Sequence, residues 1–131
     1  MYQLNGEFHK SIQVGEKMLL STPRSARLLY RLGYAYSRLG SASSIPKAKQ
    51  YLKTAIEVMP DGYEPYAELG RFALLEGRPD IAQGYFEKAW EREPTKVEVG
   101  EQLADLWRSV REPRLATLQS RLTLLKRSEE H

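Results

Sequence analysis

The sequence has no cysteine and only two histidines, His9 and His131, among its 131 residues. Without cysteine there is no disulfide, no thiolate nucleophile and no cysteine-based zinc or iron–sulfur site. Two histidines so far apart do not make a ligand cluster, so we expect no metal and no cofactor. No apolar run approaches the roughly 20 residues of a membrane-spanning helix, and no signal peptide is visible. The composition therefore argues against metalloenzymes, thiol enzymes and membrane insertion.

Other catalytic patterns are also missing from the sequence. The nine glycines are isolated from one another, so none forms a phosphate-binding loop. Serine and threonine residues have no histidine at a spacing that suggests a nucleophile and its base. Carboxylates such as Glu87 and Glu91 stand among basic residues, as on a solvated helix surface. We therefore predict that the protein is not an enzyme.

Basic residues outnumber acidic ones by 20 to 17, but the two signs are segregated along the chain. Residues 1–56 carry a net charge of +7, residues 57–105 carry −7 and residues 106–131 carry +3. A nucleic-acid-binding protein usually presents a continuous basic surface, which the acidic middle segment interrupts. A helical-repeat nucleic-acid binder is therefore the weakest alternative, and we expect no nucleic-acid partner.

The sequence repeats with a period of 34 residues. Small, aromatic and proline residues recur in step, and the first full unit carries about three extra residues in the serine-rich turn 41–44. The recurring pairs are Pro60 and Pro94, Ala48 and Ala82, Leu52 and Phe86, and Ala55 and Ala89. Each unit has the apolar spacing of two helices separated by a turn.

Local signals predict where these helices begin and end. The first helix of each full unit ends at Gly40 or Gly77, and the second ends at Pro60 or Pro94. Pro46, Pro79 and Pro113 are expected in first turns, which tolerate a missing N–H group. Asp61 with Glu64, and Thr95 with Glu98, have the spacing of capping boxes. Gly33 and Gly70 predict close helix contacts, with Ala48 and Ala82 as the small partners.

These residues resemble the signature of the tetratricopeptide repeat family. Residues 63–94 match it best, with Tyr66, Leu69-Gly70, Gly77, Ala82, Phe86, Ala89 and Pro94. The resemblance implies an all-α fold, a right-handed solenoid of stacked antiparallel helix pairs with about seven helices. The family holds peptides or partner proteins in the groove lined by the first helix of each unit.

The match divides the chain into four units. Residues 1–23 resemble the second half of a truncated repeat, with Tyr2, Gly6, Ser11, Met18 and Pro23 at the repeat positions. We expect the chain to be part of a longer array. Residues 26–60 form a repeat with the turn insertion, residues 63–94 form the best match, and residues 97–128 form a degenerate or capping repeat. In this last unit Ala116, Ser120 and Thr123 fall where alanine, phenylalanine and alanine are expected.

The resemblance predicts a non-catalytic scaffold for a protein or peptide partner, and a bacterial secretion, envelope or exopolysaccharide-export scaffold is one variant. The lysine and asparagine residues with which some relatives bind chaperone tails are missing, so that ligand is not expected. The candidate groove residues are Arg27, Tyr30, Arg31, Tyr34, Arg38, Glu64, Glu68, Arg71, Glu98, Glu101, Asp105 and Arg108.

An alternative function is self-assembly through the terminal helices. An apolar stripe on the last helix, Leu115, Leu118, Leu122 and Leu125, either packs on residues 97–110 or docks a second copy. The partner stays unidentified at this stage. The compartment stays open between the cytoplasm and the bacterial periplasm.

Overall fold

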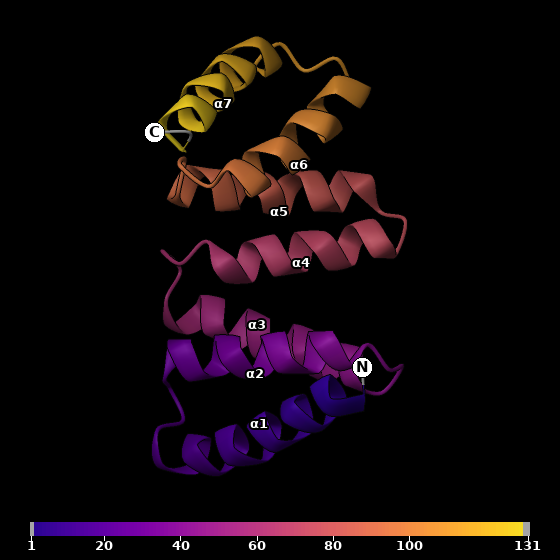
Figure 1. Cartoon of the computed structure of the whole chain (residues 1–131), viewed down its shortest axis with the longest axis vertical. Helices are drawn as coiled ribbons and strands as arrows, with labels where there is room; N and C mark the ends of the chain where they lie inside the picture. Colours follow the sequence, from indigo (N-terminus) through magenta and orange to yellow (C-terminus); the bar gives the residue numbers. More distant parts are fainter. Residues whose placement is uncertain (1, 130–131) are drawn as a thin grey trace. The chain divides into compact units, whose positions relative to one another are not determined.

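The computed structural model describes residues 2–129 of the backbone, with side chains from residue 6. The described residues form seven helices and no strand (Figure 1). The chain divides into two compact units, residues 1–68 (unit 1) and residues 69–131 (unit 2), so the boundary lies within the fourth helix. The helices are α1 (Tyr2–Ser21), α2 (Ala26–Leu39), α3 (Ser44–Val58), α4 (Glu64–Leu75), α5 (Pro79–Arg92), α6 (Val97–Ser109) and α7 (Leu115–Glu129).

The core of unit 1 forms where α2 packs on α3. Leu32 of α2 and Leu52 of α3 are almost completely buried. A Cβ atom at Gly33 would lie only 2.8 Å from the Leu52 side chain and 3.2 Å from the Ala48 carbonyl oxygen. The predicted close approach at Gly33 is confirmed, but the side chain that fills the space is Leu52, and Ala48 contributes its backbone.

The carboxylate of Glu16 on α1 forms hydrogen bonds with side chains of α2 and α3. Glu16 accepts hydrogen bonds from the hydroxyl groups of Tyr36, at 3.0 Å, and Tyr51, at 2.7 Å. The two tyrosine rings stack with centroids 5.7 Å apart. Burial, followed by the hydrogen bond to Glu16, raises the pKa of both tyrosines above the ordinary value. The cluster therefore joins α1, α2 and α3.

The repeat register does not predict which face of α1 is buried. The helix continues through Gly6, although the repeat places a turn there. Ile12 and Gly15 are buried, whereas Ser11 and Met18, which the repeat aligns with core positions, are exposed. The buried side of α1 therefore contains Ile12 and Gly15 rather than Ser11 and Met18. Met1 and the side chain of Tyr2, which the pattern also uses, lie outside the described residues.

The core of unit 2 is built from the end of α4 and from α5, α6 and α7. Phe86 and Leu103 are fully buried. A Cβ atom at Gly70 would lie 2.9 Å from the Phe86 ring, which confirms the second close approach, and its nearest neighbours are atoms of Phe86. A Cβ atom at Gly100 would meet both Leu122 and Trp90. The large side chains of α5 and α7 thus occupy the space that the glycines leave.

Helix α7 is shifted by two residues from the register that the 34-residue period predicts. Ala116 is exposed, while Leu118 and Leu122 are 4% and 5% exposed. These leucines have the spacing of Ala48 and Leu52 in α3. The turn before α7 is therefore two residues longer than the period allows. It also follows that the middle of the leucine stripe packs inward, so Leu118 and Leu122 are unavailable to a second copy.

The helix ends confirm some of the predicted signals. Gly40 and Gly77 have φ angles of 67° and 72°, the left-handed conformation that favours glycine after a helix. Pro79 occupies the first turn of α5. Pro46 also lies in a first turn, as the third residue of α3, which begins at Ser44. Pro113 instead lies before α7.

Both predicted capping boxes are wrong. The N-cap of α4 is Tyr63, whose carbonyl oxygen accepts a bond from the Ala67 N–H, so Asp61 lies too early to cap. The N-cap of α6 is Lys96, and the Thr95 hydroxyl donates instead to the Glu93 carboxylate. A reciprocal serine pair stands where no box was predicted: the Ser44 N–H donates to the Ser41 side chain and the Ser41 N–H to the Ser44 side chain.

Candidate functional site

The predicted residues of α2 form one polar and aromatic face of unit 1. Arg27, Arg31, Tyr34 and Arg38 are spaced by four, three and four residues, so they share one side of the helix. All four are exposed, and Tyr30 beside them is half-buried. The N-cap Ser25 fixes the start of this helix by accepting a bond from the Leu28 N–H. A regular helix therefore presents three cations and two aromatic rings together.

Three of these residues touch one another directly. The Tyr30 and Tyr34 rings have centroids 6.3 Å apart and are tilted by 41°. The Arg38 guanidinium carbon lies 4.6 Å from the centre of the Tyr34 ring, within the range of a cation–π contact. Arg38 also reaches the Glu68 carboxylate at 3.4 Å. Glu68 is buried, so this predicted groove residue holds Arg38 in place rather than facing a partner.

A hollow of about 420 Å³ lies between α1 and the aromatic face of α2. Its walls are largely apolar and come from both helices. The residues that line it are Phe8, Ser11, Tyr30, Arg31, Tyr34 and Ala35. Phe8 and Ser11 were not among the predicted groove residues, because those were taken from the first helix of each repeat and residues 1–23 were expected to form a second helix. The spacing of Phe8, Ile12 and Leu19 on one face of α1 was the available signal.

Two cations of this face have no internal partner. Within the described part of the chain, Arg27 and Arg31 make no hydrogen bond, ion pair or ring contact. Before residue 57 the chain carries only two acidic residues, Glu7 and Glu16, against nine basic ones. Glu16 is already bound by two tyrosine hydroxyl groups. The α2 face is therefore electropositive and open.

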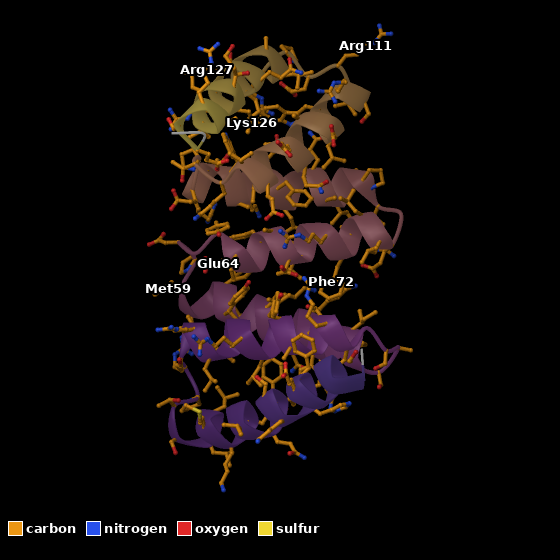
Figure 2. The ribbon with its side chains drawn as sticks, viewed as in Figure 1. Met59, Glu64, Phe72, Arg111, Lys126 and Arg127 are labelled. Atoms are coloured by element: carbon orange, nitrogen blue, oxygen red, sulfur yellow. The ribbon has the colours of Figure 1, made fainter. Side chains whose placement is uncertain are left out.

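Two predicted acidic residues lie at the beginnings of helices. Glu64 is the first residue of α4, where Figure 2 labels it, and Glu98 is in the first turn of α6. A carboxylate at this position stabilises the positive end of the helix dipole. Arg71, on α4, is half-buried.

Three predicted residues of unit 2 are paired with neighbouring charges. Glu101 contacts the ammonium group of Lys126, on α7, at 2.7 Å, and Asp105 accepts a bond from Arg108 at 3.0 Å. They line an open polar hollow between α6 and α7 (Figure 2 labels Lys126). Lys126 was not among the predicted residues, because those were taken from the first helix of each repeat and Lys126 lies on the second helix of the last one. This surface offers charges that already neutralise one another.

A second charged cluster of unit 2 supports the turn before α7. Arg114 contacts Glu87 at 2.8 Å and Glu112 at 2.9 Å, and its guanidinium lies 4.5 Å from the centre of the Trp107 ring. The hydrogen bond from Arg114 lowers the pKa of Glu112. These contacts link α5, α6 and α7 and have a structural role.

The described residues contain no group of three or more potential metal ligands. No helix among them combines the length and hydrophobicity needed to cross a membrane.

Comparisons with known proteins identify the fold. No protein-family model matches the chain, and no curated protein sequence matches it. Solved structures of MamA are similar. A double mutant of MamA RS-1 has a TM-score of 0.74 at 18% identity, with 95% of this chain and 68% of that chain covered.

Two further MamA structures agree. MamA from Desulfovibrio magneticus RS-1, residue 41 to the end, has a TM-score of 0.71 at 19% identity over 96% of this chain and 70% of that one. MamA MSR-1 has a TM-score of 0.68 at 18% identity over 98% and 72%. MamA is a tetratricopeptide-like protein. The chain therefore has a tetratricopeptide-type fold, an all-α solenoid.

Proposed function

We propose that this protein is a non-catalytic scaffold that binds a protein or peptide partner. The helical-repeat fold supports this function, because stacked helix pairs offer extended surfaces for partners. We further propose that the chain contains the four units outlined from the sequence, with residues 1–23 as a partial repeat. Secretion, envelope and exopolysaccharide-export assemblies are the settings in which we would seek the partner first.

One observation carries the proposal: the exposed face of α2 combines two tyrosine rings with two cations that lack internal partners. Tyrosine and arginine are the residue types that contribute most to binding at protein interfaces. In unit 2, by contrast, Glu101 and Asp105 are paired within the unit. We therefore favour the α2 face over the other predicted groove residues as the main contact surface.

Affinity capture from an extract of the source organism tests the proposal. The binding variant is Arg27→Glu with Arg31→Glu. The matched control is Lys53→Glu with Arg127→Glu, which changes the net charge equally at exposed residues outside the α2 face. Circular dichroism verifies that all three proteins are equally helical.

We expect a protein partner to be captured by the wild type and the control and to be lost by the binding variant. Capture of the same partner by all three proteins would place binding elsewhere on the scaffold. Failure of the wild type to capture any protein would contradict the scaffold function.

A further inference from the structure

The hollow between α1 and α2 continues into a second one along the same helix pair. The second hollow has a volume of about 160 Å³ and is lined by apolar residues that include Val14, Met18 and Leu28. Ser11 and Arg31 line both hollows. The two hollows therefore form one track, which we call the α1–α2 groove, with Arg31 at its middle.

The groove exposes apolar side chains to solvent. Met18 is 56% exposed and Val14 is 51% exposed, on the rim of the second hollow. Tyr34, on the rim of the first, is 38% exposed. Each of these side chains would lose contact with water if an apolar side chain entered the hollow beside it, and such burial favours binding by about 25 cal/mol per Å².

The charge of the groove is one-sided. Arg31 stands between the two hollows and Arg27 precedes it by one helical turn, and neither has an ionic partner among the described residues. A carboxylate could form a bidentate, charge-assisted pair with either guanidinium group. A basic segment would instead be repelled by both.

We propose that the α1–α2 groove binds an acidic protein segment, which inserts one apolar side chain into each hollow and places a carboxylate against Arg31. The inference rests on the proposed scaffold function and names the chemistry of the partner. The apolar walls supply affinity, and the central arginine selects segments that carry an acidic residue between or beside the two apolar ones.

The geometry favours a protein segment over single-stranded nucleic acid. Bases bind to open aromatic faces on which they can stack. The guanidinium of Arg38 already contacts the Tyr34 ring. The planes of the Tyr30 and Tyr34 rings are tilted by 41° relative to each other. The two rings therefore do not form a parallel slot for a base, and the buried carboxylate of Glu68 beside Arg38 disfavours a phosphate there.

A random dodecapeptide library displayed on phage tests the inference with the full chain as bait. Selections run in parallel on the wild type, on Arg31→Glu and on Lys53→Glu, a matched charge reversal on α3 outside the groove. Synthetic copies of the enriched peptides are then measured by fluorescence polarisation. Met18→Ser adds an apolar test at a side chain that is 56% exposed, and circular dichroism checks that the variant stays helical.

We expect the wild type and Lys53→Glu to enrich the same peptides, rich in aspartate or glutamate with leucine, phenylalanine or tryptophan nearby. Their affinity should fall at least tenfold on Arg31→Glu and several-fold on Met18→Ser, and oligouridylate RNA should not compete. Enriched peptides without acidic residues, or bound equally by Arg31→Glu, would overturn the inference while leaving the scaffold function intact. Competition by the RNA would overturn it in favour of a nucleic-acid site. A wild type that enriches no peptide would also overturn it, and partner capture would then decide the scaffold function separately.

Discussion

The Tyr51 hydroxyl on α3 donates a hydrogen bond of 2.7 Å to the Glu16 carboxylate on α1. Tyr36, on α2, donates to the same carboxylate oxygen, so a single acidic side chain connects three helices. The aromatic rings of both donors stack on each other. The contact is a long-range one in sequence, since 35 residues separate the two partners.

Replacing Tyr51 by phenylalanine should lower the free energy of unfolding at neutral pH. It should also make that free energy fall less steeply as the pH rises through the alkaline range. The loss of a hydrogen bond to a charged group should cost roughly 1.5 kcal/mol at neutral pH. Burial and the bond to Glu16 raise the pKa of Tyr51 above its ordinary value of 10.0. The folded state therefore holds this proton more tightly, and the stabilisation, complete below pH 10, is lost as the pH rises above it. Urea unfolding between about pH 8 and 11.5 measures both effects.

The control for this prediction is Tyr34→Phe, whose hydroxyl group makes no hydrogen bond with the described residues. In this variant the free energy of unfolding should fall with rising alkaline pH as steeply as in the wild type. Parallel curves for Tyr51→Phe and the wild type would show that the Glu16 contact does not form in solution.

Two glycine-to-alanine substitutions should have opposite effects. At Gly33 the new methyl group would lie 2.8 Å from the buried Leu52 side chain, so Gly33→Ala should destabilise the protein by about 1–3 kcal/mol. At Gly84, inside α5, no atom lies within 4 Å of the added Cβ, so Gly84→Ala should stabilise it by about 0.5–1 kcal/mol. Thermal unfolding of both variants measures the difference, and equal shifts would contradict the tight packing at Gly33.

The register of α7 predicts which of its residues stabilise unit 2. Leu122→Ala removes a buried side chain beside Gly100 and should cost about 2–5 kcal/mol. Ser120→Ala changes an exposed residue and should alter the stability by no more than about 0.5 kcal/mol. The 34-residue period would predict the larger effect at residue 120. Chemical denaturation of the two variants therefore distinguishes the registers directly.

Removal of Arg114 should raise the pKa of the Glu112 carboxyl group. The hydrogen bond from the Arg114 side chain holds that pKa below the ordinary value of 4.5 in the folded protein. The stabilisation linked to this group is present above pH 4.5 and is lost as the pH falls through the lowered pKa. NMR titration of the Glu112 carboxyl carbon in Arg114→Ala should give a value nearer 4.5. Arg127→Ala, at an exposed residue of α7, should leave the titration unchanged.

The fold class could be predicted from the sequence because the repeat encodes packing directly. Leu52 and Phe86 recur 34 residues apart, and both are buried. Their positions follow from helical periodicity, which needs no knowledge of how the chain turns. The terminal helices carry weaker repeats: both helices form where they were predicted, but the buried residues differ from those that the repeat indicates. The turn before α7 contains two more residues than the period allows, which moved every expected contact of that helix.

The helix caps and part of the candidate site required the structure. A capping box depends on which residue is the N-cap, the last non-helical residue before the helix begins. Tyr63 and Lys96 are the N-caps of α4 and α6, although neither residue type is favoured there. The exposed stripe on α2 was predictable from spacing alone. The position of Phe8 in the hollow beside Tyr30 and Tyr34 could not be predicted, because it depends on how α1 lies against α2.

The tight contacts at Gly33, Gly70 and Gly100 have an evolutionary consequence. At each one a glycine and a large side chain, Leu52, Phe86 or Leu122, share a fixed volume between two helices. A larger residue at the glycine is compatible with the fold when its partner shrinks by a similar amount. Related sequences should therefore covary at these pairs, and the sum of the two side-chain volumes should vary less than either volume does.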